Sequence, residues 1–337
     1  MPPDEPMRAP ARDAATADTA APPHATVRPA PAHPASDPRR AAAWMLGALV
    51  AFSVVAISGR EAMRTIGALE LMFWRAAIGF AVLAALHAAR GGTLAALASG
   101  RPALAAGRGV VHFGAQYAWM AALMLIPLVE VFALEFTAPL WVAVLAPLLL
   151  GERLTPARAA AAALGFVCAL VVVWPAGAGP SPVEFVARMS LGTGSLLALA
   201  AAVGFALNML AMRRLAPTDR PFVLLAWMHA VQLPMAAVLV AFGPGLALAD
   251  TRTFGWAALC AAGGLCAHYS LSRASRLADA IVVAPMDFLR VPLIAAVGAA
   301  VYGEPLRLPV ALGAAGILVA NGLNLWAERR AARVSRA

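Results

Sequence analysis

The sequence predicts an all-α polytopic membrane protein, with ten transmembrane helices arranged as two inverted five-helix repeats. Three observations lead to this fold class. Hydrophobic residues make up 62% of the 337 residues and charged residues only 13%, which is outside the range of soluble proteins. The apolar residues fall into stretches of about 20, each long enough to cross a hydrocarbon core of about 30 Å as a helix. One short acidic phrase also occurs twice, as expected of a duplicated half.

Residues 1–40 are rich in proline and alanine and contain no apolar run, so they cannot bury enough surface to fold. They also lack a signal-peptide core, and we expect the first span to act as an uncleaved anchor. We predict a disordered cytoplasmic tail at 1–40, five-helix repeats at 41–174 and 191–327, and a cytoplasmic tail at 328–337. The expected spans are 41–59, 67–88, 104–125, 129–150, 156–174, 191–213, 221–243, 255–272, 280–302 and 309–327.

The repeated phrase consists of an acid followed by phenylalanine: Glu135-Phe136 in the fourth span and Asp287-Phe288 in the ninth. The two copies are 152 residues apart, because 287 − 135 = 152. An acid within membrane-length apolar sequence is rare and marks a functional site by default. The same offset relates Gly151-Glu152 to Gly303-Glu304, and Tyr117 to Tyr269.

The arginines predict the orientation. Every basic residue of the chain is arginine, and with a cytoplasmic N-terminus sixteen of them flank the inner ends of the spans against five in outer loops. This bias places both termini in the cytoplasm of a cell with a cytoplasmic (inner) membrane. Topology thus explains the net charge of +9, and we expect no nucleic-acid partner. Five spans per repeat is an odd number, so the second repeat enters the membrane inverted, an architecture typical of secondary transporters.

Three motifs resemble parts of an EamA domain of the drug/metabolite transporter superfamily: Phe73-Trp74-Arg75, the run from Glu135 to Trp141, and the run from Leu150 to Thr155. The second copy is weaker, since Pro292 lies one place away from the position that matches Pro139. The resemblance covers residues 43–326. It implies a central cavity, alternating access and the export of a small metabolite or drug-like molecule, and it leaves the substrate open.

Candidate site residues are polar groups within the spans. Glu135 lies 16 residues before Gly151, or about 24 Å of helix, which places it in the outer third of the membrane. Inversion places Asp287 in the inner third, about 18 Å away in a core of about 30 Å, so we expect no contact between the two acids. Arg75 is within reach of Glu135, as a structural ion pair or as a substrate-binding pair. Asp287 and Arg290 share a helix face and either neutralise each other or line the inner cavity.

Other polar residues have two interpretations. His112 and His268 either carry protons or are packing residues with satisfied hydrogen bonds. The aromatic residues Trp74, Tyr117 and Tyr269 either line the cavity or pack and anchor the helices. Asn208 either lines the cavity or bonds a neighbouring helix. We interpret Glu130 as a solvated acid at a helix start, Glu152 and Glu304 as braces of the following helix, and the three cysteines as packing residues.

The resulting prediction is a carrier whose partners are a small-molecule substrate and the lipid bilayer, with no cofactor, no metal and no catalytic residues. Proton coupling through Glu135 or Asp287 is a hypothesis that follows from their position within the spans. A passive pore is one alternative, and it would never accumulate substrate against its gradient. An intramembrane enzyme is another, but the sequence contains no His-Glu-x-x-His, no Gly-x-Ser-x-Gly and no Cys/His ligand spacing.

Overall fold

The computed structural model describes residues 37–151, 155–174, 192–243, 245–246, 250–277 and 286–334. Over these ranges every expected span contains helix, although the fourth is interrupted, and residues 36–337 belong to one compact unit. The first repeat contains α1 (Pro38–Ala62), α2 (Ala68–Ala89), the short 3-10 helix η1 (Leu94–Leu97), α3 (Pro102–Leu125), α4 (Leu128–Glu135), α5 (Ala138–Leu150) and α6 (Pro156–Val172). The second contains α8 (Thr193–Leu215), α9 (Pro221–Ala241), α10 (Thr251–Leu277), α12 (Arg290–Tyr302) and α13 (Leu308–Val334).

The helix ends follow from local sequence. Asp37 caps α1 by accepting a hydrogen bond of 3.1 Å from the Arg40 amide, and Thr155 caps α6 in the same way. Proline occupies the first helical position of α6, where its missing N–H costs nothing. Gly151 and Gly303 end α5 and α12 with positive φ angles of 69° and 64°, a conformation that other residues rarely adopt.

The fourth span is not a continuous helix, contrary to the prediction for 129–150. It breaks at Phe136 and Thr137, directly after Glu135, into α4 and α5. The Thr137 hydroxyl donates to the Leu134 carbonyl at 2.7 Å and satisfies one of the free backbone groups at the break. In the second copy a turn at Phe288 and Leu289 precedes α12, so the repeated acid–Phe phrase marks a helix interruption in both halves. The predicted residues 280–285 lie outside the described part of the chain.

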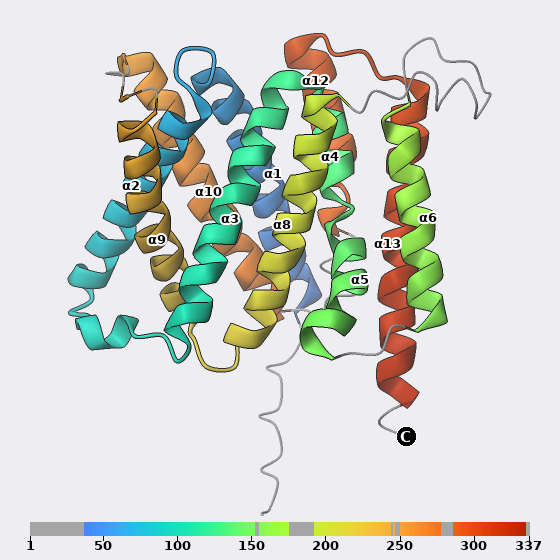
Figure 1. Cartoon of the computed structure of the whole chain (residues 1–337), viewed down its shortest axis with the longest axis horizontal. Helices are drawn as coiled ribbons and strands as arrows, with labels where there is room; N and C mark the ends of the chain where they lie inside the picture. The colour runs from blue at the N-terminus through green and yellow to red at the C-terminus, as the bar shows by residue number, and fades with distance from the viewer. Residues whose placement is uncertain are drawn as a thin grey trace, which may run out of the picture. The chain divides into compact units, whose positions relative to one another are not determined.

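The helix pairings repeat between the halves. The helix α1 packs along α10, and in the equivalent arrangement α3 packs along α8, while α2 faces α9 and α6 faces α13. Figure 1 shows that α1 and α8 run in opposite directions, as do α3 and α10. The second repeat is therefore inverted relative to the first, as the odd span count predicts.

Within the described part of the chain, six helical segments are long and apolar enough to cross a membrane on length and composition alone, with α4 and α5 taken together as Leu128–Leu150. They begin at Arg39, Ala68, Leu128, Thr193, Pro221 and Leu308, and α6 and α12 are shorter apolar helices. The equivalent helices α3 and α10 are more polar: α3 carries Arg108, His112 and Gln116, and α10 carries His268. These polar residues are placed where α3 and α10 face the interior of the helix bundle.

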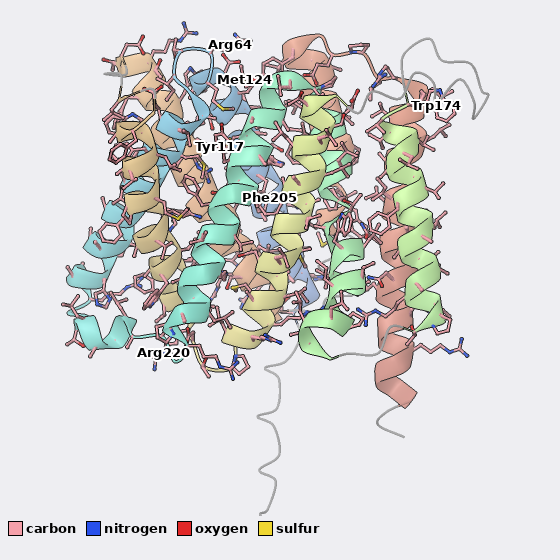
Figure 2. The ribbon with its side chains drawn as sticks, viewed as in Figure 1. Arg64, Tyr117, Met124, Trp174, Phe205 and Arg220 are labelled. Atoms are coloured by element: carbon pink, nitrogen blue, oxygen red, sulfur yellow. The ribbon has the colours of Figure 1, made fainter. Side chains whose placement is uncertain are left out.

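Figure 2 shows Arg64 and Arg220 at opposite ends of the helix bundle, and we name the two ends after them. At the Arg220 end, Asp219 in the α8–α9 turn accepts hydrogen bonds from the Ser99 hydroxyl and from the Gly100 amide at 2.9 Å. Burial alone would raise the pKa of Asp219, but these hydrogen bonds outweigh burial and hold the pKa below its ordinary value. Asp219 thereby joins the α2–α3 connection to the second repeat.

Candidate functional site

One arginine forms hydrogen bonds with both acids of the repeated phrase. Arg290, the first residue of α12, donates to Asp287 at 2.7 Å and to Glu135 at 3.2 Å. The Trp119 indole N–H donates to the second oxygen of Glu135 at 2.8 Å. The three charged side chains are 8%, 16% and 23% exposed for Arg290, Glu135 and Asp287 respectively. We call Glu135, Arg290 and Asp287 the ionic triad. It joins α4 of the first repeat to α12 of the second.

Aromatic rings surround the triad. The Arg290 guanidinium lies 4.3 Å from the centre of the Phe52 ring and 5.0 Å from that of Phe136, distances at which a cation is attracted to a ring face. The phenylalanines of the two phrases, Phe136 and Phe288, pack edge to face with their centres 5.7 Å apart. The repeated phrase therefore builds one shared cluster in which both the acids and the rings converge.

This arrangement contradicts the expectation that Glu135 and Asp287 lie about 18 Å apart. That expectation treated each span as a straight helix along the membrane normal. In the structure each span is interrupted beside its acid, α4 packs against α12, and the long Arg290 side chain reaches both carboxylates. Glu135 bonds Arg290 and Trp119, whereas Arg75, which the sequence placed within its reach, contacts the Met72 sulfur instead. The expected contact between Asp287 and Arg290 is confirmed.

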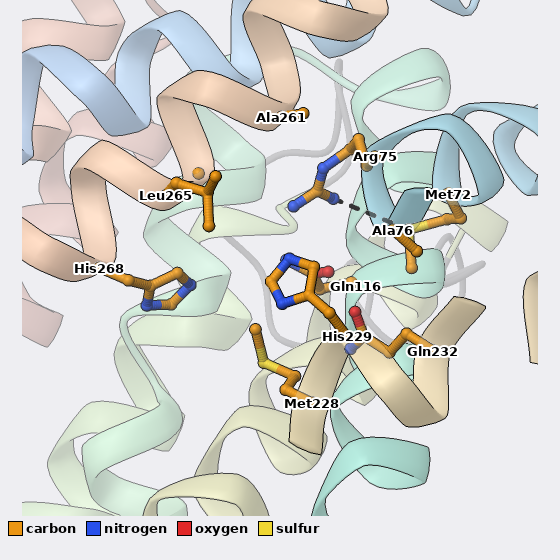
Figure 3. A pocket seen from close by; sticks show the side chains of 11 residues that line it. Met72, Arg75, Ala76, Gln116, Met228, His229, Gln232, Ala261, Leu265 and His268 are labelled. Atoms are coloured by element: carbon orange, nitrogen blue, oxygen red, sulfur yellow. Dashed lines mark hydrogen bonds between the residues drawn. The ribbon is translucent and has the colours of Figure 1, made fainter. Parts of the chain in front are cut away.

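A separate polar cavity lies between α2, α3, α9 and α10 (Figure 3). About 20 Å³ of space remains inside it, which suits roughly one water molecule, so this conformation is closed around the cavity. Figure 3 shows the Arg75 guanidinium and the His229 ring turned into the same space, with His268 across from them. The residues lining the cavity are Met72, Arg75, Ala76, Gln116, Met228, His229, Gln232, Ala261, Gly264, Leu265 and His268.

Three histidines converge on this region. His112 is buried behind the cavity and accepts a hydrogen bond of 3.0 Å from the Gln232 amide, and its ring centre lies 6.1 Å from that of His268. Nδ1 of His229 bonds the Leu225 carbonyl at 3.0 Å, which directs the other side of its ring inward. Gly79 leaves room for that ring, because a Cβ at this position would lie 2.3 Å from it. His112 and His268 are thus brought together, while Gln116, His229 and Gln232 are site residues that the sequence analysis missed.

The other aromatic candidates lie away from the cavity. Tyr117 and Tyr269 are 38% and 55% exposed, and Tyr269 packs edge to face on Trp44 at 5.6 Å. Trp74 packs between Phe73 and Phe254, both at 5.4 Å, which favours packing over cavity lining. The Asn208 amide oxygen is buried without a hydrogen-bond partner in the described part of the chain, and Asn208 is not among the residues that line the cavity.

A second polar network lies at the Arg64 end. Glu304 accepts a hydrogen bond of 2.8 Å from the Leu128 amide, the first of α4, and pairs with Arg60. It therefore caps α4 in the other repeat, and the expectation that it braces the following helix is wrong. Glu130 is 5% exposed and pairs with Arg307, so it is buried and not a solvated acid. Glu152, which is equivalent to Glu304 in the first repeat, lies outside the described residues.

Metal and disulfide chemistry find no support among the described residues. No group of three or more His, Cys, Asp or Glu side chains there could hold a metal ion. Cys168, Cys260 and Cys266 are free cysteines, of which Cys260 is buried, Cys168 is half-buried and Cys266 is exposed.

Together, the fold and the site define a polytopic helical transporter whose two inverted repeats meet at buried polar groups. The chain belongs to the EamA-like transporter family of the drug/metabolite transporter superfamily, a family of transporters and not of enzymes. The family profile matches residues 39–174, the first of the two repeats.

Two relatives carry a functional name. A protein of Rhizobium johnstonii named riboflavin transporter is 30% identical over 304 residues, which span 89% of this chain and 96% of the relative. A second protein named riboflavin transporter, from Brucella anthropi, is 29% identical over 65% of this chain and 73% of its own length. A crystal structure of a protein with 24% identity has a TM-score of 0.56 and covers 86% of this chain and 98% of that chain, which shows a shared fold.

Proposed function

We propose that this chain carries riboflavin, or a compound with the same ring system, across the cytoplasmic membrane by alternating access. The observation that carries the proposal is the similarity over 96% of the length of a relative named riboflavin transporter. The chemistry of the cavity is compatible with it, because riboflavin presents ring carbonyls and a ring N–H, and the cavity presents the amide and N–H groups of Gln116, Gln232 and Arg75.

The moving parts in this proposal are built mainly from the repeats 41–174 and 191–327, with α4 of the first repeat moving with the second, and both terminal tails lie in the cytoplasm. A flavin ring cannot enter about 20 Å³, so binding requires that α2 and α3 separate from α9 and α10. The closed cavity then corresponds to one state of the transport cycle, and substrate enters in another.

Proton coupling through the ionic triad is the second part of the proposal. The triad contains two carboxylates and one guanidinium, so with all groups ionised it holds one surplus negative charge in a largely buried place. Intramembrane acids of this kind mark proton relays and ion pathways. A proton taken up by Glu135 or Asp287 would neutralise the surplus and weaken one of the two contacts that join α4 to α12.

Uptake into proteoliposomes tests the proposal. The purified protein is expected to accumulate riboflavin above the external concentration when a pH gradient is imposed, and an unrelated amino acid should not be transported. Glu135→Gln and Asp287→Asn should abolish the response to the gradient, whereas Asp37→Asn, at an exposed helix cap, should retain it. Equilibration without accumulation would favour a passive pore. Loading flavin inside or outside the vesicles determines whether net flow is outward, as the family resemblance implies.

A further inference from the structure

The cavity lining holds one permanently charged group, the Arg75 guanidinium, without a counter-charge. The imidazoles of His229 and His268 also line it, and none of the eleven lining residues is acidic. Charged groups within membrane spans usually pair with an opposite charge or face a wet cavity, because an isolated charge is costly there. The lining therefore favours a ligand that brings negative charge or hydrogen-bond acceptors.

Arg75 is the lining group with the most unused hydrogen-bonding capacity. The contact it makes within the described residues is a long one of 3.7 Å to the sulfur of Met72, a weak acceptor. Its Nε is buried without a hydrogen-bond partner. A guanidinium has five N–H donors in a planar fork, so several remain free toward the cavity.

Two other buried arginines, Arg290 and Arg108, differ from Arg75 in their contacts. Arg290 is neutralised by two acids in the ionic triad. Arg108 donates to the Leu224 carbonyl at 3.1 Å and contacts the Met228 sulfur at 3.9 Å, and it is not among the residues that line the polar cavity. Among the residues that line the polar cavity, Arg75 is therefore the arginine whose guanidinium keeps unused N–H donors.

Amide groups accompany Arg75. Gln116 makes no side-chain hydrogen bond among the described residues, and Gln232 uses its N–H on His112 and keeps its carbonyl oxygen free. Gly264 lies behind the guanidinium, where even a Cβ would come within 3.5 Å of its Nη2. The lining thus offers a fork of donors next to groups that can both donate and accept.

We infer that Arg75 recognises the substrate through a planar edge that carries two adjacent hydrogen-bond acceptors, with Gln116 or Gln232 bonding the neighbouring N–H and carbonyl. This inference rests on the proposed function, because the flavin ring has such an edge: N1 and the C2 carbonyl oxygen are adjacent acceptors, followed by the N3 N–H and the C4 carbonyl. An arginine fork bonds two adjacent acceptors at once, which an ammonium group cannot do with the same geometry.

The test pairs a change in the protein with a change in the ligand. Binding is measured by isothermal titration calorimetry on the purified full-length protein, for riboflavin and for its 2-thio analogue, in which a weakly accepting sulfur replaces the C2 oxygen. The protein should bind riboflavin about tenfold or more tightly than the thio analogue, since hydrogen bonds to charged groups are strong. Arg75→Gln should remove this preference, Arg75→Lys should retain part of it, and Arg90→Gln, at the exposed residue that follows the same helix, should retain all of it.

The outcomes separate the inference from the proposed function. If Arg75→Gln weakens binding of both flavins equally, or of neither, Arg75 does not bind the edge formed by N1 and the C2 carbonyl oxygen. The inference is then overturned, while the proposed binding of riboflavin still stands. If the unmodified protein binds neither flavin, the proposed function fails as well. Size-exclusion profiles and thermal unfolding of each variant show that a lost preference comes from a folded protein.

Discussion

Replacing Arg290 with glutamine should destabilise the protein far more than replacing either of its acidic partners. Arg290 is 8% exposed and lies 3.2 Å from Glu135 and 2.7 Å from Asp287. Without it, two largely buried carboxylates face each other with no cation between them. Removing one partner of a buried ion pair costs about 3–5 kcal/mol, because the remaining charge is left uncompensated.

The acids should behave differently because removing one of them leaves a neutral pair. Glu135→Gln keeps the contact between Arg290 and Asp287 and removes the repulsion between the two carboxylates. We expect a loss of about 1–3 kcal/mol from the weaker hydrogen bonds, partly offset by that relief. The triple variant Glu135→Gln, Arg290→Gln, Asp287→Asn carries no charge in the triad and should be more stable than Arg290→Gln alone, because only an unpaired buried charge incurs the full penalty.

Denaturant unfolding in detergent micelles, followed by tryptophan fluorescence, gives the free energy of unfolding of each variant. The expected order of stability is the unmodified protein, then Glu135→Gln, then Arg290→Gln, with the triple variant above Arg290→Gln. If Arg290→Gln unfolds with the same free energy as the unmodified protein, or if the triple variant is the least stable, the triad does not hold α4 and α12 together in the way the distances indicate.

Three further changes test separate parts of the structure. Gly79→Ala should cost about 1–3 kcal/mol of stability and reduce transport, because the new Cβ would lie 2.3 Å from the His229 ring; replacing His229 with alanine in the same variant should restore stability. Trp119→Phe should remove the hydrogen bond of 2.8 Å to Glu135 and lower the free energy of unfolding by about 1.5–3 kcal/mol, with little change in packing volume. The contribution of Asp219 should be complete above the ordinary aspartate pKa of about 3.9 and lost as pH falls through its depressed folded-state pKa, and Asp219→Asn should abolish that loss in unfolding measured across this range.

The architecture could be predicted because it depends on local properties of the sequence. Each span needs only a stretch of apolar residues of sufficient length, and the odd number of five spans per repeat requires inversion. The contact between Asp287 and Arg290 was also predictable, because residues three apart are close together on a helix, and the short turn at Phe288 and Leu289 keeps them within reach.

The partner of Glu135 could not be predicted, because it depends on where a helix breaks. Pro139 cannot donate a backbone hydrogen bond to the carbonyl of residue 135 and so favours a break here, but many spans only kink at a proline. A continuous span would have left Glu135 and Arg290 at different depths. The polar cavity was missed for a related reason. Gln116, His229 and Gln232 are single polar residues in apolar runs, and only the packing of α9 against α2 and α3 brings them together. Arg290 was the informative signal, because the equivalent position of the first repeat is Ala138 (290 − 152 = 138) and carries no charge.

The contacts of α4 suggest that the moving bodies do not coincide with the two sequence repeats. Three side chains of the second repeat hold this eight-residue helix: Glu304 at its first amide, Arg307 at Glu130 and Arg290 at Glu135. The helix also packs more extensively on α8, α12 and α13 than on α3 and α6. We therefore expect α4 to move with the second repeat and the chain to bend at Phe136 and Thr137, where no regular helix resists bending.

A thiol cross-link across this contact distinguishes the two possibilities. Leu128→Cys and Glu304→Cys are combined in a chain whose three native cysteines are replaced by alanine, and transport is compared in the same preparation before and after a short bifunctional reagent joins them. If α4 travels with the second repeat, the link spans residues that stay together and transport continues at the rate seen before cross-linking. If α4 travels with the first repeat, the same link joins parts that must separate, and transport stops until a reducible reagent is cleaved. A block that reduction reverses would assign α4 to the first repeat and move the expected hinge away from Phe136 and Thr137.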